Sequence, residues 1–312
     1  MTETASVGLS VIIPIYNGAA IVEELARRLA PILKDTGESH ELVLIDDGST
    51  DASWDAITQA AAAWSFVRGF KLSRNFGQQI AVSAGIAKAR GRYLIVMDGD
   101  LQNPPEAVPG ILARLRGGDD IVYTVSRVRN NRRNQFTSQL FWFVLTRLLG
   151  VDIIRDQLMM RGMSRRFARI YDSYPEITRT VAGLSRDIGL RHSILEVENR
   201  PRSSGRSGYT FFKRFNLMIN MIISITTAPL SILIYVSLSV LIITTLVSTY
   251  YLIIALFFNA QAGFTSIILS IFFFGSLITL ILGIIGMYLA NIYTEVRRRP
   301  LFLVEEQTDS HG

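Results

Sequence analysis

Asp98 and Asp100 are the residues of this chain whose types and spacing most suit chemistry. They directly follow the apolar run 93–97, whose β-branched composition predicts a buried strand. Two carboxylates at a strand end can hold one hard divalent cation while water and substrate phosphates complete its coordination shell. An isolated Asp-Gly-Asp is more often a plain acidic turn that caps a helix, so its meaning depends on the residues that surround it.

The residues after this acidic pair predict the start of a helix. Asn103 is a favourable N-cap, Pro104 suits the first helical position, and Glu106 completes a capping box. We therefore expect the two carboxylates to lie on a loop between a strand and a helix over 104–116.

Strand and helix patterns alternate through the first two-thirds of the chain. The expected strands are 9–15, 41–45, 67–72, 93–97 and 120–125, and the expected helices are 20–34, 51–64, 78–89 and 104–116. This alternation predicts an α/β fold, with a Rossmann-like, mostly parallel sheet and helices on both faces. Ligands of such sheets bind beyond the carboxyl ends of the strands. Polar clusters stand at four of these ends: Tyr16-Asn17, Asp46-Asp47, Ser73-Arg74-Asn75, and Asp98 with Asp100.

The loop after the first strand narrows the possible phosphate chemistry. It contains one glycine, Gly18, and no Lys-Ser or Lys-Thr pair, so it is neither a dinucleotide fingerprint nor a P-loop. A metal would then have to hold the phosphates, as in nucleotide-sugar transferases, where the cation acts as a Lewis acid on the departing diphosphate. The absence of cysteine excludes disulfides, thiolate metal sites and cysteine nucleophiles.

Four motifs together resemble the family 2 inverting glycosyltransferases with a GT-A fold, and among them the polyprenyl-phosphate glycosyltransferases. The motifs are VIIPIYN (11–17), DDGS (46–49), LSRNFG (72–77) and DGDLQNPPE (98–106). The resemblance implies that Asp98, Asp100 and Gln102 gather around a magnesium or manganese ion. We expect the donor-binding residues to be Pro14, Tyr16, Asn17, Asp46, Asp47, Asn75, Gln78 and Asp98. The family usually has an acidic residue in place of Gly18 and often Lys or His in place of Gln78.

Arginines in the middle of the chain suit phosphate through bidentate hydrogen bonds. Arg127 follows a strand end, and we expect it to be catalytic together with Asp98 and Asp100. The resemblance implies a phosphate contact near Ser138, with Arg133 substituting for the family's basic residue at Asn134. A solvated basic face is the alternative for the neighbouring arginines.

Two further segments leave alternatives open. The Gly/Ser-rich stretch 202–209 is either a flexible linker or, by the resemblance, a loop that closes over substrate with Arg202 and Arg206 on phosphate. Asp156 precedes Arg161 in a segment that the resembled family places before a strand. Asp156 could orient an active-site arginine or cap a turn.

Composition divides the chain into a soluble part and a membrane part. The 312 residues carry a net charge of +6, and their mean hydropathy of +0.30 is high for a soluble protein. From Phe215 to Thr294 there is no Asp, Glu, Lys or Arg. We expect a catalytic domain over 1–208, an interfacial helix over 209–227, transmembrane helices at 229–258 and 264–293 within 228–294, and a tail over 295–312, polar and disordered from Val304.

Basic residues flank the predicted membrane hairpin at Lys213-Arg214 and at 297–299. The positive-inside rule then places the catalytic domain and both termini in the cytosol, in a multi-pass protein of the cell (inner) membrane. No secretory signal peptide is recognised at the amino end. A donor site beside a bilayer suits a lipid acceptor, here a polyprenyl phosphate such as undecaprenyl or dolichyl phosphate.

The expected reaction is inverting transfer of a sugar from a nucleotide-sugar donor to this phosphate. The acceptor is largely ionised at neutral pH, so it needs no strong general base. Two alternatives remain: a hydroxyl-acceptor or processive membrane glycosyltransferase, and a non-catalytic nucleotide-binding membrane scaffold. We expect no nucleic-acid partner, and a homo-oligomer is suggested only by analogy.

Overall fold

The structure, a computed structural model, describes residues 7–100, 103–126, 157–174, 181, 188–198, 264–297 and 299–308, with isolated positions 239, 242, 243, 246 and 250. The chain forms two compact units. The first comprises residues 1–132, 153–206 and 299–312, and the second 133–152 and 207–298. Arg127, Arg133, Ser138, Arg202, Arg206, Gln102 and Asp156 lie outside the described residues, as does most of the predicted helix 229–258 and all of the predicted interfacial helix.

The first unit is built on a single sheet with the strand order β7-β5-β6-β4-β1-β2-β3-β8. The strands are β1 (Leu9–Ile15), β2 (His40–Asp46), β3 (Val67–Leu72), β4 (Tyr93–Val96), β5 (Ile121–Ser126), β6 (Gln157–Ser164), β7 (His192–Val197) and β8 (Val304–Gln307). β1 pairs in parallel with β2 and β4, β2 with β3, and β5 with β7. β6 and β8 pair antiparallel with their neighbours, so the sheet is mixed with a parallel centre.

Helices cover both faces of the sheet, as the alternation predicts. They are α1 (Ala19–Asp35), α2 (Ser53–Ala63), α3 (Gln78–Lys88), the 3₁₀ helix η1 (Pro105–Ala107), α4 (Val108–Arg116) and α6 (Arg165–Ser173). One core cluster joins α1, α2 and α4 to the side chains of Leu9, Val11 and Ile13 on β1. The other joins α3 and α6 to Ile12 on the opposite face of β1.

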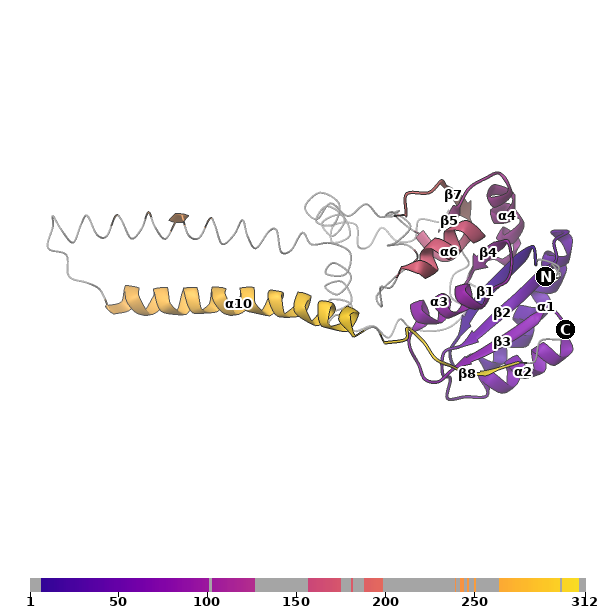
Figure 1. Cartoon of the computed structure of the whole chain (residues 1–312), viewed down its shortest axis with the longest axis horizontal. Coiled ribbons are helices and arrows are strands. Elements are labelled where there is room, and N and C mark those ends of the chain that lie inside the picture. Colours follow the sequence, from indigo (N-terminus) through magenta and orange to yellow (C-terminus); the bar gives the residue numbers. More distant parts are fainter. Residues whose placement is uncertain are drawn as a thin grey trace. The chain divides into compact units, whose positions relative to one another are not determined.

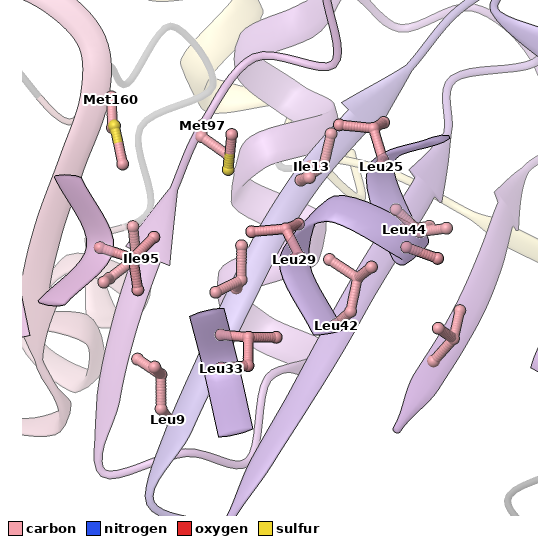
Figure 2. Packing of buried hydrophobic residues seen from close by; sticks show 14 of the residues in the cluster. Leu9, Ile13, Leu25, Leu29, Leu33, Leu42, Leu44, Ile95, Met97 and Met160 are labelled. Carbon is pink, nitrogen blue, oxygen red and sulfur yellow. The ribbon is translucent and has the colours of Figure 1, made fainter. Parts of the chain in front are cut away.

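β1 is apolar at every position except Ser10. Leu9, Val11, Ile12 and Ile13 are all completely buried, because a central parallel strand is covered on both faces. In Figure 2, Leu25, Leu29 and Leu33 of α1 lie over the side chains of β1 and β2. This rigid core fixes the strand ends from which the polar loops extend.

The predicted capping box after β4 is wrong. The residue that precedes the first helical turn is Pro104, and no side chain caps that turn. Asn103 instead donates from Nδ2 to Asp98 Oδ2 at 2.9 Å. This hydrogen bond to a carboxylate is charge-assisted, so Asn103 supports the acidic loop directly.

The prediction of a disordered tail from Val304 is also wrong. Val304–Gln307 forms β8, which pairs antiparallel with β3 at the edge of the sheet and is drawn in yellow in Figure 1. Two hydrogen bonds secure its end: Thr308 N–H donates to Gly69 O at 3.0 Å, and Gly69 N–H donates to Thr308 Oγ1 at 2.9 Å. The polar sequence reflects an edge strand rather than a disordered segment.

In the second unit, α10 (Phe264–Val296) covers the second predicted membrane helix. Several of its large apolar side chains are exposed, among them Ile271 at 65% and Leu282 at 62%. Within the described parts of the chain, no helix reaches the combination of length and apolarity that a membrane span requires. The predicted transmembrane hairpin is therefore not confirmed.

Candidate active site

A pocket of about 670 Å³ opens at the carboxyl ends of β1 and β4. Its lining comes from residues 14–21 after β1, from Asp98, Gly99 and Asp100 after β4, and from Asp51, Gln78 and Met159. The chain proceeds from β1 through β2 to β3 on one side and then returns to β4 on the other side of β1. The strand order therefore reverses at β1 and β4, and open α/β sheets bind their ligands at such a switch point (Figure 1).

Asn17 joins the first two loops of the pocket. Its φ of 49° is positive, and its Oδ1 accepts the backbone N–H of Thr50 at 2.9 Å. Its own N–H donates to Ser49 Oγ at 2.9 Å. Asparagine tolerates this left-handed conformation better than most residues, and the two bonds hold the β1 and β2 loops together.

Asp46 ends β2 and is almost completely buried. One oxygen, Oδ1, accepts the N–H of Ser49 at 3.0 Å. The other, Oδ2, is buried, and no described residue forms a hydrogen bond with it. A buried carboxylate oxygen normally has a partner, so Asp46 retains acceptor capacity for a donor group such as a hydroxyl or an imide N–H.

Asp47 fixes the loop that follows β3. Its Oδ1 accepts Phe76 N–H at 2.8 Å and its Oδ2 accepts Gly77 N–H at 2.9 Å. Burial raises the pKa of this carboxyl, and the two backbone donors oppose that rise only in part. Gly48 allows the β2 and β3 loops to approach this closely, because a Cβ there would lie 2.3 Å from the carbonyl carbon of Arg74. The β2 and β3 loops are thus interlocked.

Asp98 is held in place from two sides. Gln78 Nε2 donates to its Oδ1 at 2.7 Å, and Asn103 Nδ2 donates to its Oδ2. Burial raises the pKa of Asp98, and the charge of Asp100 raises it further. The two amide donors and the cation of Arg161 lower it, but less. Packing around Gly99, between the acids, is close: a Cβ there would lie 2.9 Å from Ile15 Cδ1 and 3.3 Å from Pro14 O.

This pair of acids fits a divalent cation. Both carboxylates line one pocket, and their mutual repulsion raises the pKa of Asp98 in the absence of a counter-charge. Magnesium sites commonly use one or two carboxylates and complete the shell with water and substrate phosphates. Among the described residues, no group of three or more His, Asp or Glu is placed to hold a metal.

The structure brings most of the predicted donor residues to the pocket and leaves others beside it. Pro14, Tyr16, Asn17, Gln78, Asp98 and Asp100 line the pocket. Asp46 and Asp47 lie buried below the adjoining loops, and Asn75 is exposed on the β3 loop. Their roles in binding stay predictions. The predicted phosphate contacts and the third metal ligand, Gln102, lie outside the described residues.

Sequence reasoning missed several supporting residues. Asp51 accepts the N–H of Ala19 at 3.3 Å and the N–H of Ser53 at 3.0 Å, which ties α2 to the start of α1. The Ser-Thr-Asp cluster before α2 is typical of such side-chain to backbone bonds and could have indicated them. Met159, from β6, lines the pocket and has no comparable sequence signal.

Arg161, two residues beyond Met159 on β6, is also part of this environment. Its side chain is buried, and its Nε donates to Met159 O at 2.9 Å. Burial lowers its pKa, while Tyr123 and Asp98 raise it, so Arg161 is a buried positive charge near the acidic loop. The β4–β6 pairing sets Arg161 opposite Val96, two residues before Asp98.

The chain is similar to curated proteins over nearly its whole length. It is 34% identical over 305 residues to an undecaprenyl-phosphate 4-deoxy-4-formamido-L-arabinose transferase of Shewanella sediminis, covering 96% of this chain and 92% of that protein. It is 31% identical over 304 residues to an uncharacterised glycosyltransferase of Synechocystis, covering 96% of each.

A solved structure shares the fold. Glucosyl-3-phosphoglycerate synthase of Mycobacterium tuberculosis, crystallised with Mn²⁺, UDP-glucose and phosphoglyceric acid, superposes with a TM-score of 0.51 at 18% identity. The match covers 73% of this chain and 80% of that one. Residues 10–189, which contain the whole pocket, match the glycosyl transferase family 2, and the chain belongs to that family.

Proposed function

We propose that this glycosyltransferase moves a sugar from a nucleotide-sugar donor to a polyprenyl phosphate at the cytosolic face of a membrane, with inversion at the anomeric carbon. The observation that carries the proposal is the switch-point pocket with Asp98 and Asp100 on one side and the loop of Tyr16 and Asn17 on the other. The named activity of the Shewanella relative supports a polyprenyl-phosphate acceptor.

The pocket has groups that suit both the base and the diphosphate of a nucleoside diphosphate. Tyr16 is 52% exposed at the pocket wall, where its ring offers a stacking surface for a base. Asp46 Oδ2, at the end of β2, is a buried acceptor without a partner among the described residues. The acidic pair then faces the diphosphate. Asp98 and Asp100 would hold a divalent cation such as Mg²⁺ or Mn²⁺, which would stabilise the charge on the departing diphosphate.

The reaction needs little proton transfer from the protein. A phosphate oxygen of the acceptor attacks the anomeric carbon, the bond from that carbon to the diphosphate oxygen breaks, and the nucleoside diphosphate leaves with the bonding electrons. The acceptor oxygen is already ionised at neutral pH. The protein's task is to hold the donor and stabilise developing charge, and Gln78 and Asn103 serve it by fixing the Asp98 carboxylate.

We also propose a membrane location, which would suit a lipid acceptor. The uncharged run from Phe215 to Thr294 and the exposed apolar side chains of α10 favour contact with lipid. The arginines at 127, 133, 202 and 206 and Ser138 complete the proposed site as phosphate contacts. The catalytic domain over 1–208 and both termini would then lie in the cytosol.

One assay separates this reaction from its alternatives. The purified full chain is given a panel of nucleotide sugars with undecaprenyl phosphate, with undecaprenol, or with no acceptor. We expect a sugar-linked lipid only with the phosphate. Product from undecaprenol alone would favour a hydroxyl-acceptor enzyme, and no product with any donor, despite nucleotide binding, would favour a scaffold. Either result would overturn the proposal.

A further inference from the structure

The segment that follows α10 returns to the catalytic unit and joins its sheet. Besides the strand pairing of β8 with β3, Trp54 Nε1 donates to Glu306 Oε2 at 2.9 Å, and Lys71 forms an ion pair with the same carboxylate at 2.5 Å. Phe302 and Val304 pack against the core cluster beneath α3. This is an integrated strand, with backbone, polar and apolar contacts.

The same segment reaches the β3 loop, residues 73–77. The carbonyl oxygen of Leu303 accepts the N–H of Ser73 at 3.0 Å, at the first residue of the loop. The last residues of the loop are held by Asp47, through the N–H groups of Phe76 and Gly77. Phe76 packs against the same core cluster as Phe302 and Val304. The loop is therefore clamped at one end by β2 and at the other by the C-terminal segment.

This loop leads directly into the donor pocket. Gln78, the next residue, begins α3, lines the pocket and donates to Asp98. If residues 302–308 detached, the N–H of Ser73 would lose its partner and the edge of β3 would be uncovered. The loop would then be fixed only by Asp47, and Gln78 would be less well placed for its bond to Asp98.

We propose that the C-terminal segment 302–308 positions the donor-binding loop 73–77, with Phe302 and Val304 as positioning residues for nucleotide binding. The inference rests on the proposed function of the pocket. Because coupling between two sites is reciprocal, a nucleotide that needs an ordered loop must also strengthen the docking of β8. A strand that only covers the sheet edge would show no such coupling.

The test compares two changes on the same strand in the purified full chain. The variant Phe302→Ala/Val304→Ala removes both half-buried side chains that pack on the core. Leu303→Ala is the matched control, because its side chain is 56% exposed while its backbone oxygen is kept. Affinity for UDP, GDP and ADP is measured by titration in the presence of MnCl₂. Docking of β8 is followed by the fluorescence of Trp54 in a Trp64→Phe/Trp142→Phe background, because the chain has three tryptophans.

We expect the double variant to bind the preferred nucleotide about tenfold more weakly, within the usual range of coupling between sites, and the control to bind like the wild type. In the wild type, nucleotide should slow hydrogen exchange at the amides of Ser73 and Thr308. Unchanged affinity in a double variant whose strand has detached would overturn the positioning role and leave the proposed function intact. If the wild type bound no nucleotide, both the positioning role and the proposed function would be overturned.

Discussion

Replacing Gly48 with alanine tests whether the interlocked β2 and β3 loops hold the donor site. Gly48 has a φ of +65°, and a Cβ there would lie 2.3 Å from the carbonyl carbon of Arg74 and 2.5 Å from the nitrogen of Asn75. Both neighbours are backbone atoms, so no side-chain rotation relieves the contact. One loop must move away from the other.

The magnitude follows from two separate costs. A left-handed conformation costs a residue with a Cβ about 1–2 kcal/mol. Overpacking against surroundings that cannot rearrange freely adds about 1–3 kcal/mol. The sum is about 2–5 kcal/mol, shared between the free energy of unfolding and the affinity of the pocket for nucleotide.

Gly37→Ala separates the two costs. Gly37 has a similar φ of +70°, but nothing lies within 4 Å of the position its Cβ would take. This control carries the conformational cost alone, in the turn after α1. The free energy of unfolding is measured by urea denaturation of the full chain, followed by tryptophan fluorescence, and nucleotide affinity is titrated on the folded protein.

We expect Gly48→Ala to lose about 1–3 kcal/mol more than Gly37→Ala, and only Gly48→Ala to weaken nucleotide binding. Equal losses of stability and equal affinities in the two variants would refute the idea that this close contact supports the site.

Three further predictions concern the surroundings of the site. Asp47→Asn leaves one oxygen for two backbone N–H groups, and we expect nucleotide affinity, measured by titration, to fall about tenfold, as the loss of a hydrogen bond to a charged group suggests. Glu41→Ala removes the buried partner of Arg68. This substitution should lower the free energy of unfolding in urea by about 3–5 kcal/mol. It should leave nucleotide affinity unchanged, because Glu41 lies near the start of β2, at the end of the sheet away from the pocket. The third prediction concerns pH. The Lys71 bond lowers the pKa of Glu306 from 4.5, and the same bond raises the pKa of Lys71 from 10.5. Docking of β8, followed by the fluorescence of Trp54 in the Trp64→Phe/Trp142→Phe background, should therefore weaken as pH falls below about 4.5 or rises above about 10.5. A docking signal that is flat through both limits would contradict the ion pair.

The centre of the fold could be predicted from the sequence because its signals are local. β1 and β3 have the predicted bounds, Leu9–Ile15 and Val67–Leu72. β1 is apolar except for the buried Ser10, and β3 buries its apolar residues and leaves Arg68 and Lys71 half-buried. The acidic pair and the loop of Tyr16 and Asn17 could be assigned to one site because parallel strands present their carboxyl ends at the same edge.

The parts that could not be predicted depend on residues far apart in the chain. β8 has one apolar residue, Val304, and is stabilised by Trp54 and Lys71, which are separated from Glu306 by 252 and 235 positions. No local pattern contains that information. The position of Asn103 was misjudged for a related reason, because capping preference describes a helix start and ignores an acceptor such as Asp98 on the preceding loop.

The most direct test of the proposed reaction is transfer of labelled sugar to undecaprenyl phosphate by the full chain, with and without a chelator, in wild type, Asp100→Asn and Asp55→Asn. Asp55, exposed on α2, is the control for loss of one acidic charge. We predict lipid-linked product that disappears with the chelator and falls about 100-fold or more in Asp100→Asn, as expected when an electrostatic stabiliser of the transition state is removed. Asp55→Asn should retain wild-type activity. Transfer that persists in the chelator, or at wild-type rate in Asp100→Asn, would contradict the role of the acidic pair.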